Sequence, residues 1–169
     1  DVYDFRYQMP VEECGNMLLM VAAAMEADGN IGMARDNLDL LDQWVQYLIT
    51  YGRDPGEQLC TDDFAGHLKG NVNLSGKAIM GIAAYALILE RLGRTERAQK
   101  MHAAAKEMAD YVVQKADAGD HLTLTNEGVG WSMKYNFIWD RLFHLDLVDQ
   151  KVYQREMSFY LKHLNRYGL

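Results

Sequence analysis

Two groups of carboxylates stand just before apolar segments of the chain, where side chains of this type could transfer protons. Asp62 and Asp63 precede one such segment, and Glu12 and Glu13 open another, directly after Pro10. In a cleft, the pKa values of two neighbouring carboxyl groups can separate, which yields one acid and one base for hydrolysis. Each group also has a structural explanation, as an Asx-turn or as compensation of a helix dipole. Asp62, Asp63 and Glu13 are the predicted catalytic residues, with that alternative open.

Other side chains are suited to holding a substrate. Glu12 and Asn16 are four residues apart and share one helical face, whereas Glu13 lies about 100 degrees around the helix, so at most one glutamate can point into a central cleft. Asn16 interrupts an apolar helix and could hold a substrate amide. Lys77 or Lys134 could bind a carboxylate, although a buried lysine more commonly neutralises an acid. The predicted substrate-binding residues are Glu12, Asn16, Trp131, which we expect in a cleft wall, Lys134 and Asn136.

Helices must position these side chains, and the apolar period of about 3.6 residues predicts six of them in two alternating kinds. Three are apolar over most of their circumference and must be covered on every side; they span residues 10–27, 74–92 and 134–145. Three carry one apolar stripe, as surface helices do; they span residues 33–51, 96–115 and 151–167. Residues 1–169 are therefore predicted to form one all-α domain of about three helical hairpins, with a period near 60 residues.

The connections between these helices are unequal in length. Short turns lead from each inner helix to the next outer helix, but long polar segments, residues 52–73 and 118–133, lead back. The long loops must then meet where the inner helices begin, and such loops on a rigid frame commonly carry function. Hairpins in this order can curve into an α/α toroid, of which three would form half. A tetratricopeptide-like solenoid fits less well, because its repeat is ~34 residues.

Composition narrows the possible partners. The 169 residues include 17 basic and 24 acidic side chains, a formal charge of −7, which argues against nucleic acid as the main partner. The longest uncharged apolar run, residues 17–25, is shorter than the roughly 20 residues of a membrane crossing. The histidines show no metal-ligand spacing. We therefore expect no metal, cofactor, nucleic acid or membrane. Two cysteines exclude a disulfide scaffold, and a bond between Cys14 and Cys60 is left open.

Three ordered motifs resemble signature stretches of the glutaminase A family of fungi and gut bacteria. They are PVEECGNM at residues 10–17, DPG at 54–56 with TDDFAG at 61–66, and WSMKYN at 131–136 with WDRL at 139–142. The resemblance implies a six-hairpin toroid related to glycosidase folds, hydrolysis of L-glutamine to glutamate and ammonia, and a secreted or periplasmic location. Because Cys60 stands where the family motif is expected to have serine, a required cysteine is not expected there.

The resemblance also implies partners. We expect a small-molecule substrate, either glutamine or a sugar-like compound, and the remaining hairpins of a longer parent protein, since the chain starts without Met and family members continue further. The family supplies no catalytic assignment to transfer, so the predicted mechanism is attack by an activated water. Two alternatives stay open: a glycoside hydrolase that uses the same carboxylates, and a helical interaction module without catalysis.

Overall fold

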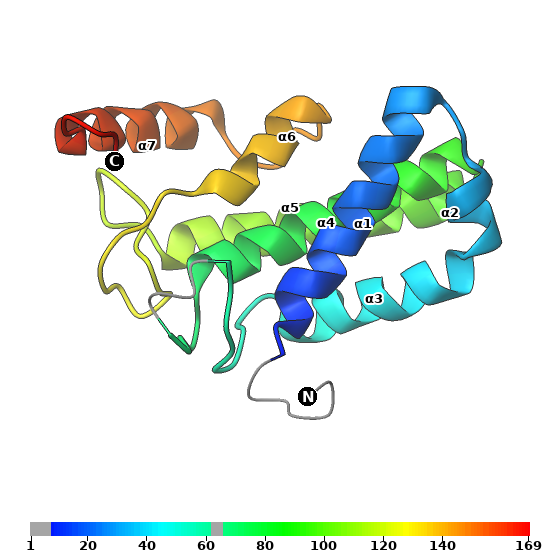
Figure 1. The fold of residues 1–169 in the computed structure, drawn as a ribbon, viewed down its shortest axis with the longest axis horizontal. Coiled ribbons are helices and arrows are strands. Elements are labelled where there is room, and N and C mark those ends of the chain that lie inside the picture. The colour runs from blue at the N-terminus through cyan, green and yellow to red at the C-terminus, as the bar shows by residue number, and fades with distance from the viewer. Residues whose placement is uncertain (1–7, 62–65) are drawn as a thin grey trace.

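Helix α4, Val72–Arg91, is the centre of the fold, which the computed structural model describes for residues 8–61 and 66–169 (Figure 1). Seventeen of its 20 residues are buried, so the prediction of a fully covered inner helix is confirmed for α4. The Asn71 side chain accepts hydrogen bonds from the backbone N–H groups of Asn73 and Leu74. This cap satisfies donors that a helix start leaves free and fixes where α4 begins.

Helix α1, Pro10–Asp28, runs beside α4 in the same direction (Figure 1). An ion pair joins Glu12 to Lys77 near the two helix starts. A second ion pair joins Glu26 to Arg91 near the two helix ends. The first pair joins the helix starts and the second joins the helix ends, so the two helices run in the same direction and begin side by side.

Two glycines let α1 and α4 approach closely. A methyl group on Gly81 would lie 3.0 Å from the Cα atom of Gly15, so a side chain there would force the helices apart. The opposite side of α1 carries Met17 and Met20, which are 41% and 63% exposed. The prediction that α1 is covered on every side is therefore wrong for the described residues, because these methionines point away from α4.

The outer helices are amphipathic, as the sequence predicts. Helix α3, Leu38–Tyr51, buries Leu41, Val45 and Leu48 on one face. The predicted helix 33–51 is interrupted, however, because Asn37 has non-helical backbone angles and separates α3 from a short helix. The remaining outer elements are α2 (Gly32–Asp36), α5 (Thr95–Lys115) and α7 (Gln150–His163).

The third inner helix is shorter than the predicted span of 134–145. It consists of a 3₁₀ turn, η3 (Tyr135–Phe137), followed by α6 (Ile138–Leu142). His144 and Asp146 then adopt left-handed backbone angles, with φ of 53° and 55°, which an α-helix of L-residues cannot include. The prediction is wrong for Lys134, which precedes the 3₁₀ turn with non-helical backbone angles, and for the last three residues of that span.

Asp140 explains why the chain turns back at this point. Its carboxylate is 3% exposed and accepts hydrogen bonds from the backbone N–H groups of Leu147 and Val148, at 2.9 and 3.2 Å. The hydroxyl of Tyr153 donates to the same carboxylate at 2.6 Å. These contacts draw the segment after α6 against the helix and outweigh its apolar helical pattern. Ile138, at 53% exposure, shows that α6 is not enclosed within the described residues.

The starts of all three inner elements nevertheless converge. The Asn136 amide donates a hydrogen bond to the carbonyl oxygen of Asn73 at 2.9 Å, which ties η3 to the first turn of α4. Phe137 packs over Gly76, where an added methyl group would lie 3.0 Å from the ring. Together with the contact between α1 and α4, this confirms the alignment of starting ends. Closure into a toroid stays a prediction.

The two long loops meet at this same end, as expected from the order of the hairpins. The backbone N–H of Asn126 donates to the carbonyl oxygen of Gly70 at 2.8 Å. The Asn126 side chain donates to Asp54 Oδ1 at 2.6 Å. These hydrogen bonds link Asp54 and Gly70, which precede α4, to Asn126 in loop 118–133, so described residues of the two loops lie together near the start of α4.

By length and composition, α4 resembles a membrane-spanning helix, with a mean hydropathy of 1.5 over its most apolar window. In the structure, 94% of that window is buried among the other helices. The apolar character of α4 is thus accounted for by its central position, and one such helix is weak evidence for a membrane segment.

Candidate active site

Glu12 and Lys77 form a buried ion pair between the first turn of α1 and the second turn of α4. Lys77 Nζ lies 3.2 Å from Glu12 Oε1, and the two side chains are 8% and 2% exposed. Taking either charge out of water alone would cost several kcal/mol, so each is tolerated because the other compensates it. The start of α1 is fixed by Pro10 in its first turn and by the Val11 N–H, which donates to Gln58 Oε1 at 3.0 Å.

Two further polar side chains complete this cluster. Lys77 Nζ donates to Asn16 Oδ1 at 2.5 Å, and the Thr61 hydroxyl donates to Glu12 Oε1 at 2.9 Å. The other carboxylate oxygen, Glu12 Oε2, is buried and has no hydrogen-bond donor among the described residues. We refer to Glu12, Asn16, Thr61 and Lys77 as the Glu12 cluster.

Gly15 makes room for this arrangement. A methyl group on Gly15 would lie 2.5 Å from Lys77 Cγ and 3.0 Å from the Lys77 carbonyl oxygen. The aliphatic part of the lysine therefore passes directly over the glycine, and its ammonium group reaches the polar face of α1. The fit explains why a small residue follows Cys14 within the family-like motif at residues 10–17.

The predicted binding residue Glu12 and the predicted catalytic residue Glu13 are placed differently. Glu12 is 1% exposed, whereas its neighbour Glu13 is exposed at the surface. This confirms that at most one of the two glutamates points inward, and that one is Glu12. Asp62 and Asp63 lie outside the described residues. Their catalytic roles, and that of Glu13, stay predictions.

A second polar cluster lies one turn earlier on the same face of α4. The Asn73 amide donates to Ser132 Oγ at 3.2 Å and to the Met133 carbonyl oxygen at 3.0 Å. Lys134 Nζ donates to the Ser132 carbonyl oxygen at 2.6 Å. Asn73 and Lys77 are four residues apart and share one helical face. The predicted binding residues Glu12, Asn16, Lys134 and Asn136 thus gather along the start of α4.

Helix α7 fixes the position of Lys134. The Lys134 backbone N–H donates to the Tyr160 hydroxyl at 2.8 Å, and that hydroxyl donates to Glu156 Oε2 at 2.5 Å. Glu156 also accepts a hydrogen bond from the backbone N–H of Leu122. Burial, followed by the hydrogen bond to Glu156, raises the pKa of Tyr160 far above its ordinary value. The long loop 118–133 is thereby attached to α7 at both of its ends.

Trp131 belongs to an aromatic cluster on α7. Its ring centroid lies 4.9 Å from that of His163 and 5.3 Å from that of Phe159. Its exposed fraction is 38%. The structure therefore places Trp131 against the outer helix, and no contact joins it to the Glu12 cluster within the described residues.

The cysteines are not bonded to each other. Cys14 is half-buried and Cys60 is buried. Burial, followed by the charge of Glu13, raises the pKa of Cys14, which makes its thiol a weaker nucleophile at neutral pH. Cys60 Sγ accepts a hydrogen bond from the Asn71 amide at 3.3 Å, so it supports the cap of α4. Across residues 8–61 and 66–169, no group of His, Cys, Asp or Glu side chains could hold a metal ion.

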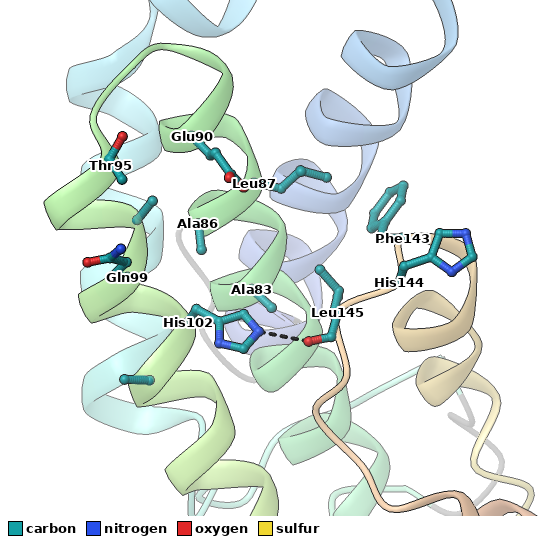
Figure 2. A pocket seen from close by; sticks show the side chains of 12 residues that line it. Ala83, Ala86, Leu87, Glu90, Thr95, Gln99, His102, Phe143, His144 and Leu145 are labelled. Carbon is teal, nitrogen blue, oxygen red and sulfur yellow. Dashed lines mark hydrogen bonds between the residues drawn. The ribbon is translucent and has the colours of Figure 1, made fainter.

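A cavity of about 440 Å³ lies at the opposite end of α4, between α4, α5 and the segment after α6 (Figure 2). Its floor is formed by small and apolar residues, among them Ala83 and Leu87. His102 Nε2 lies 2.7 Å from the Leu145 carbonyl oxygen at its edge. Among the described residues, no predicted site residue lines this cavity, which lies apart from the converging helix starts.

Sequence reasoning missed Thr61 and Asn73 as members of the polar clusters. Thr61 lies beside the predicted Asp62, in the same motif, but its hydroxyl gave no separate signal. Asn73 had a usable signal, since it and Lys77 are polar residues spaced by one helical turn in an otherwise apolar helix. That pattern predicts a polar face on the inner helix.

These features define an all-α, helical-hairpin domain with a buried acid–base pair where its inner helices begin. The model of the glutaminase A six helical-hairpin domain matches residues 1–169 of the chain. The chain therefore belongs to this family. This confirms the family resemblance and the all-helical fold class.

Two curated relatives extend this result. Glutaminase A of Aspergillus oryzae is 34% identical over 172 residues, which cover 96% of this chain and 24% of that protein. A probable glutaminase of Arthroderma benhamiae is 28% identical over 161 residues, which cover 75% of this chain and 18% of that protein. The chain thus spans a quarter or less of the length of these relatives. No solved structure matches it.

Proposed function

We propose that the full-length protein hydrolyses L-glutamine to glutamate and ammonia, and that this domain supplies part of the active site. The observation that carries the proposal is the buried Glu12–Lys77 pair, with Asn16, at the converging helix starts of a chain whose relatives are named glutaminases. An uncharged core would fold without such a pair, and buried charges are commonly retained at functional sites.

The side chains of this region match the needs of amide hydrolysis. The reaction requires a group that takes and returns protons. It also requires hydrogen-bond donors for the developing oxyanion, and a positively charged donor can serve. A carboxylate and an ammonium group are both present in the Glu12 cluster, and Asn16 is an amide able to bind the amide of glutamine. The nucleophile in this proposal is an activated water. Asp62, Asp63 and Glu13 remain in it as predicted catalytic residues.

Ammonia release from L-glutamine by the purified full-length protein tests this proposal. We expect turnover of glutamine and none of an oligosaccharide panel. Turnover of oligosaccharides without ammonia release would contradict it and favour a glycoside hydrolase acting through the same carboxylates. Absence of both activities, with saturable binding of a peptide or protein, would favour the interaction module.

The proposal includes further hairpins of the parent protein and its export from the cytoplasm. Apolar side chains on α6 and α7 support the first part, because Ile138, Leu142, Met157 and Leu161 are each more than half exposed within the described residues. Lower hydrogen exchange along α6 and α7 in the full-length protein than in this domain alone would be the expected result. The export component follows from the family resemblance, and cell fractionation tests it.

A further inference from the structure

We propose that Glu12 is the catalytic residue that takes a proton from the attacking water, and that Lys77 is its charge partner. This inference rests on the proposed amide hydrolysis. It starts from the unequal environments of the two carboxylate oxygens. Oε1 faces Lys77 Nζ at 3.2 Å and accepts from the Thr61 hydroxyl at 2.9 Å. Oε2 has no donor among the described residues, although Glu12 is 1% exposed.

A buried carboxylate oxygen without a donor is costly, and native structures usually explain each such atom by a water, an ion or a catalytic role. A water is small enough to enter a buried polar site and can donate one hydrogen bond to Oε2. The same geometry is required of a general base, which must lie within hydrogen-bonding reach of the proton it takes. Glu13, at the surface, has no comparable setting.

The proton transfer is balanced by the charges in the Glu12 cluster. One O–H bond of the water breaks, and its proton moves to Glu12 Oε2 while the water oxygen bonds to the amide carbon. The carbonyl π electrons move to the carbonyl oxygen. The negative charge thus passes from Glu12 to the oxyanion, and Lys77 remains to stabilise it. The oxyanion electrons then re-form the C=O bond as the C–N bond breaks. The leaving nitrogen receives the proton from Glu12, which releases ammonia and restores the Glu12 carboxylate.

Asn16 and Gly15 act as positioning residues for Lys77. The Asn16 amide oxygen accepts from Lys77 Nζ at 2.5 Å, and Gly15 admits the lysine stem. Two side chains of α1 therefore hold the Lys77 ammonium group, the Glu12 carboxylate and the Asn16 amide. This fixes the ammonium group beside Glu12 before substrate arrives, which reduces the reorganisation that the reaction needs.

The test measures kcat and KM for glutamine hydrolysis by the full-length protein and four variants, one of which is Glu13→Gln. Glu12→Gln removes the base but leaves Lys77 uncompensated, so a folding defect alone could lower its activity. The double variant Glu12→Gln/Lys77→Met removes both charges and restores neutrality to the buried site. Glu26→Gln is the matched control, since Glu26 pairs with Arg91 between the same two helices at their other ends.

We expect the double variant to be folded by circular dichroism and to lose about 10²- to 10⁴-fold in kcat, the usual contribution of a general base. Its KM should change by less than about 5-fold, a split that a structural defect would not produce. Glu26→Gln should keep wild-type kcat. A folded double variant with kcat within about 3-fold of wild type would overturn the assignment, as would loss of kcat in Glu13→Gln together with full activity in Glu12→Gln. Absence of glutamine turnover by the wild-type protein would instead overturn the proposed function itself, and the assignment with it.

Discussion

Replacing Lys77 by methionine removes the positive charge that faces Glu12 and keeps a flexible side chain in its place. Breaking a buried ion pair by deleting one partner typically costs about 3–5 kcal/mol, because the other charge remains uncompensated. Thr61 still donates one hydrogen bond to Glu12, so we expect the lower end, about 3 kcal/mol. In a domain of this size, that loss lowers the melting temperature by about 6–12 °C.

Urea unfolding of the domain, followed by far-UV circular dichroism, measures this loss. Glu12→Gln/Lys77→Met should recover about 2 kcal/mol of it, because a neutral pair replaces an unpaired charge. Arg91→Met is the matched control. It breaks the Glu26–Arg91 pair, whose side chains are 29% and 55% exposed, and should destabilise the domain far less. A loss below about 1 kcal/mol for Lys77→Met would refute the description of its pair as buried and mutually compensating.

Three further predictions concern stability. In Gly15→Ala, the new methyl group would lie 2.5 Å from Lys77 Cγ, and we expect this overpacking to outweigh the higher helical propensity of alanine. Urea titration should show a net loss of about 1–2 kcal/mol in the free energy of unfolding. A stabilised variant would contradict the close approach of the two helices. Asp140→Asn replaces a carboxylate oxygen, which accepts hydrogen bonds from backbone amides and from Tyr153, by an NH₂ group. We expect the free energy of unfolding to fall by about 1–3 kcal/mol and amide hydrogen exchange after α6 to become faster. Unchanged exchange would refute the role of Asp140 in turning the chain. Burial raises the pKa of Tyr160, so its contribution to stability is complete below the unfolded pKa of about 10 and declines as pH rises above it. Tyr160→Phe should flatten this alkaline decline in melting temperature, and an unchanged slope would argue against the effect.

The order of the helices and their inner or outer type could be predicted from the sequence wherever the hydrophobic pattern of a segment matched its position in the fold. The segment that became α4 is apolar over most of its circumference, and a central position is the arrangement that buries such a helix. The third inner helix could not be bounded in this way. Its apolar pattern continues to Leu145, and neither glycine nor proline marks the break at His144. Asp140 causes that break through hydrogen bonds to amides seven and eight residues away, and periodicity does not report such contacts.

In the candidate site too, helical spacing predicted part of the arrangement, and contacts with a helix distant in the sequence decided the rest. Helical spacing established that Glu12 and Glu13 face different directions, but not which of them turns inward. That choice depends on α4, whose Lys77 meets both Glu12 and Asn16 on one face of α1. A further clue was present in the sequence, because Glu12 and Asn16 are four apart on α1, and Asn73 and Lys77 are four apart on α4. Lys77 is the member of the α4 row that meets the α1 row, whereas Asn73 is buried against Ser132 and Met133. Since α1 and α4 run parallel with their starts aligned, Glu12 is the glutamate that this reasoning selects, and it is the one that the structure buries against Lys77.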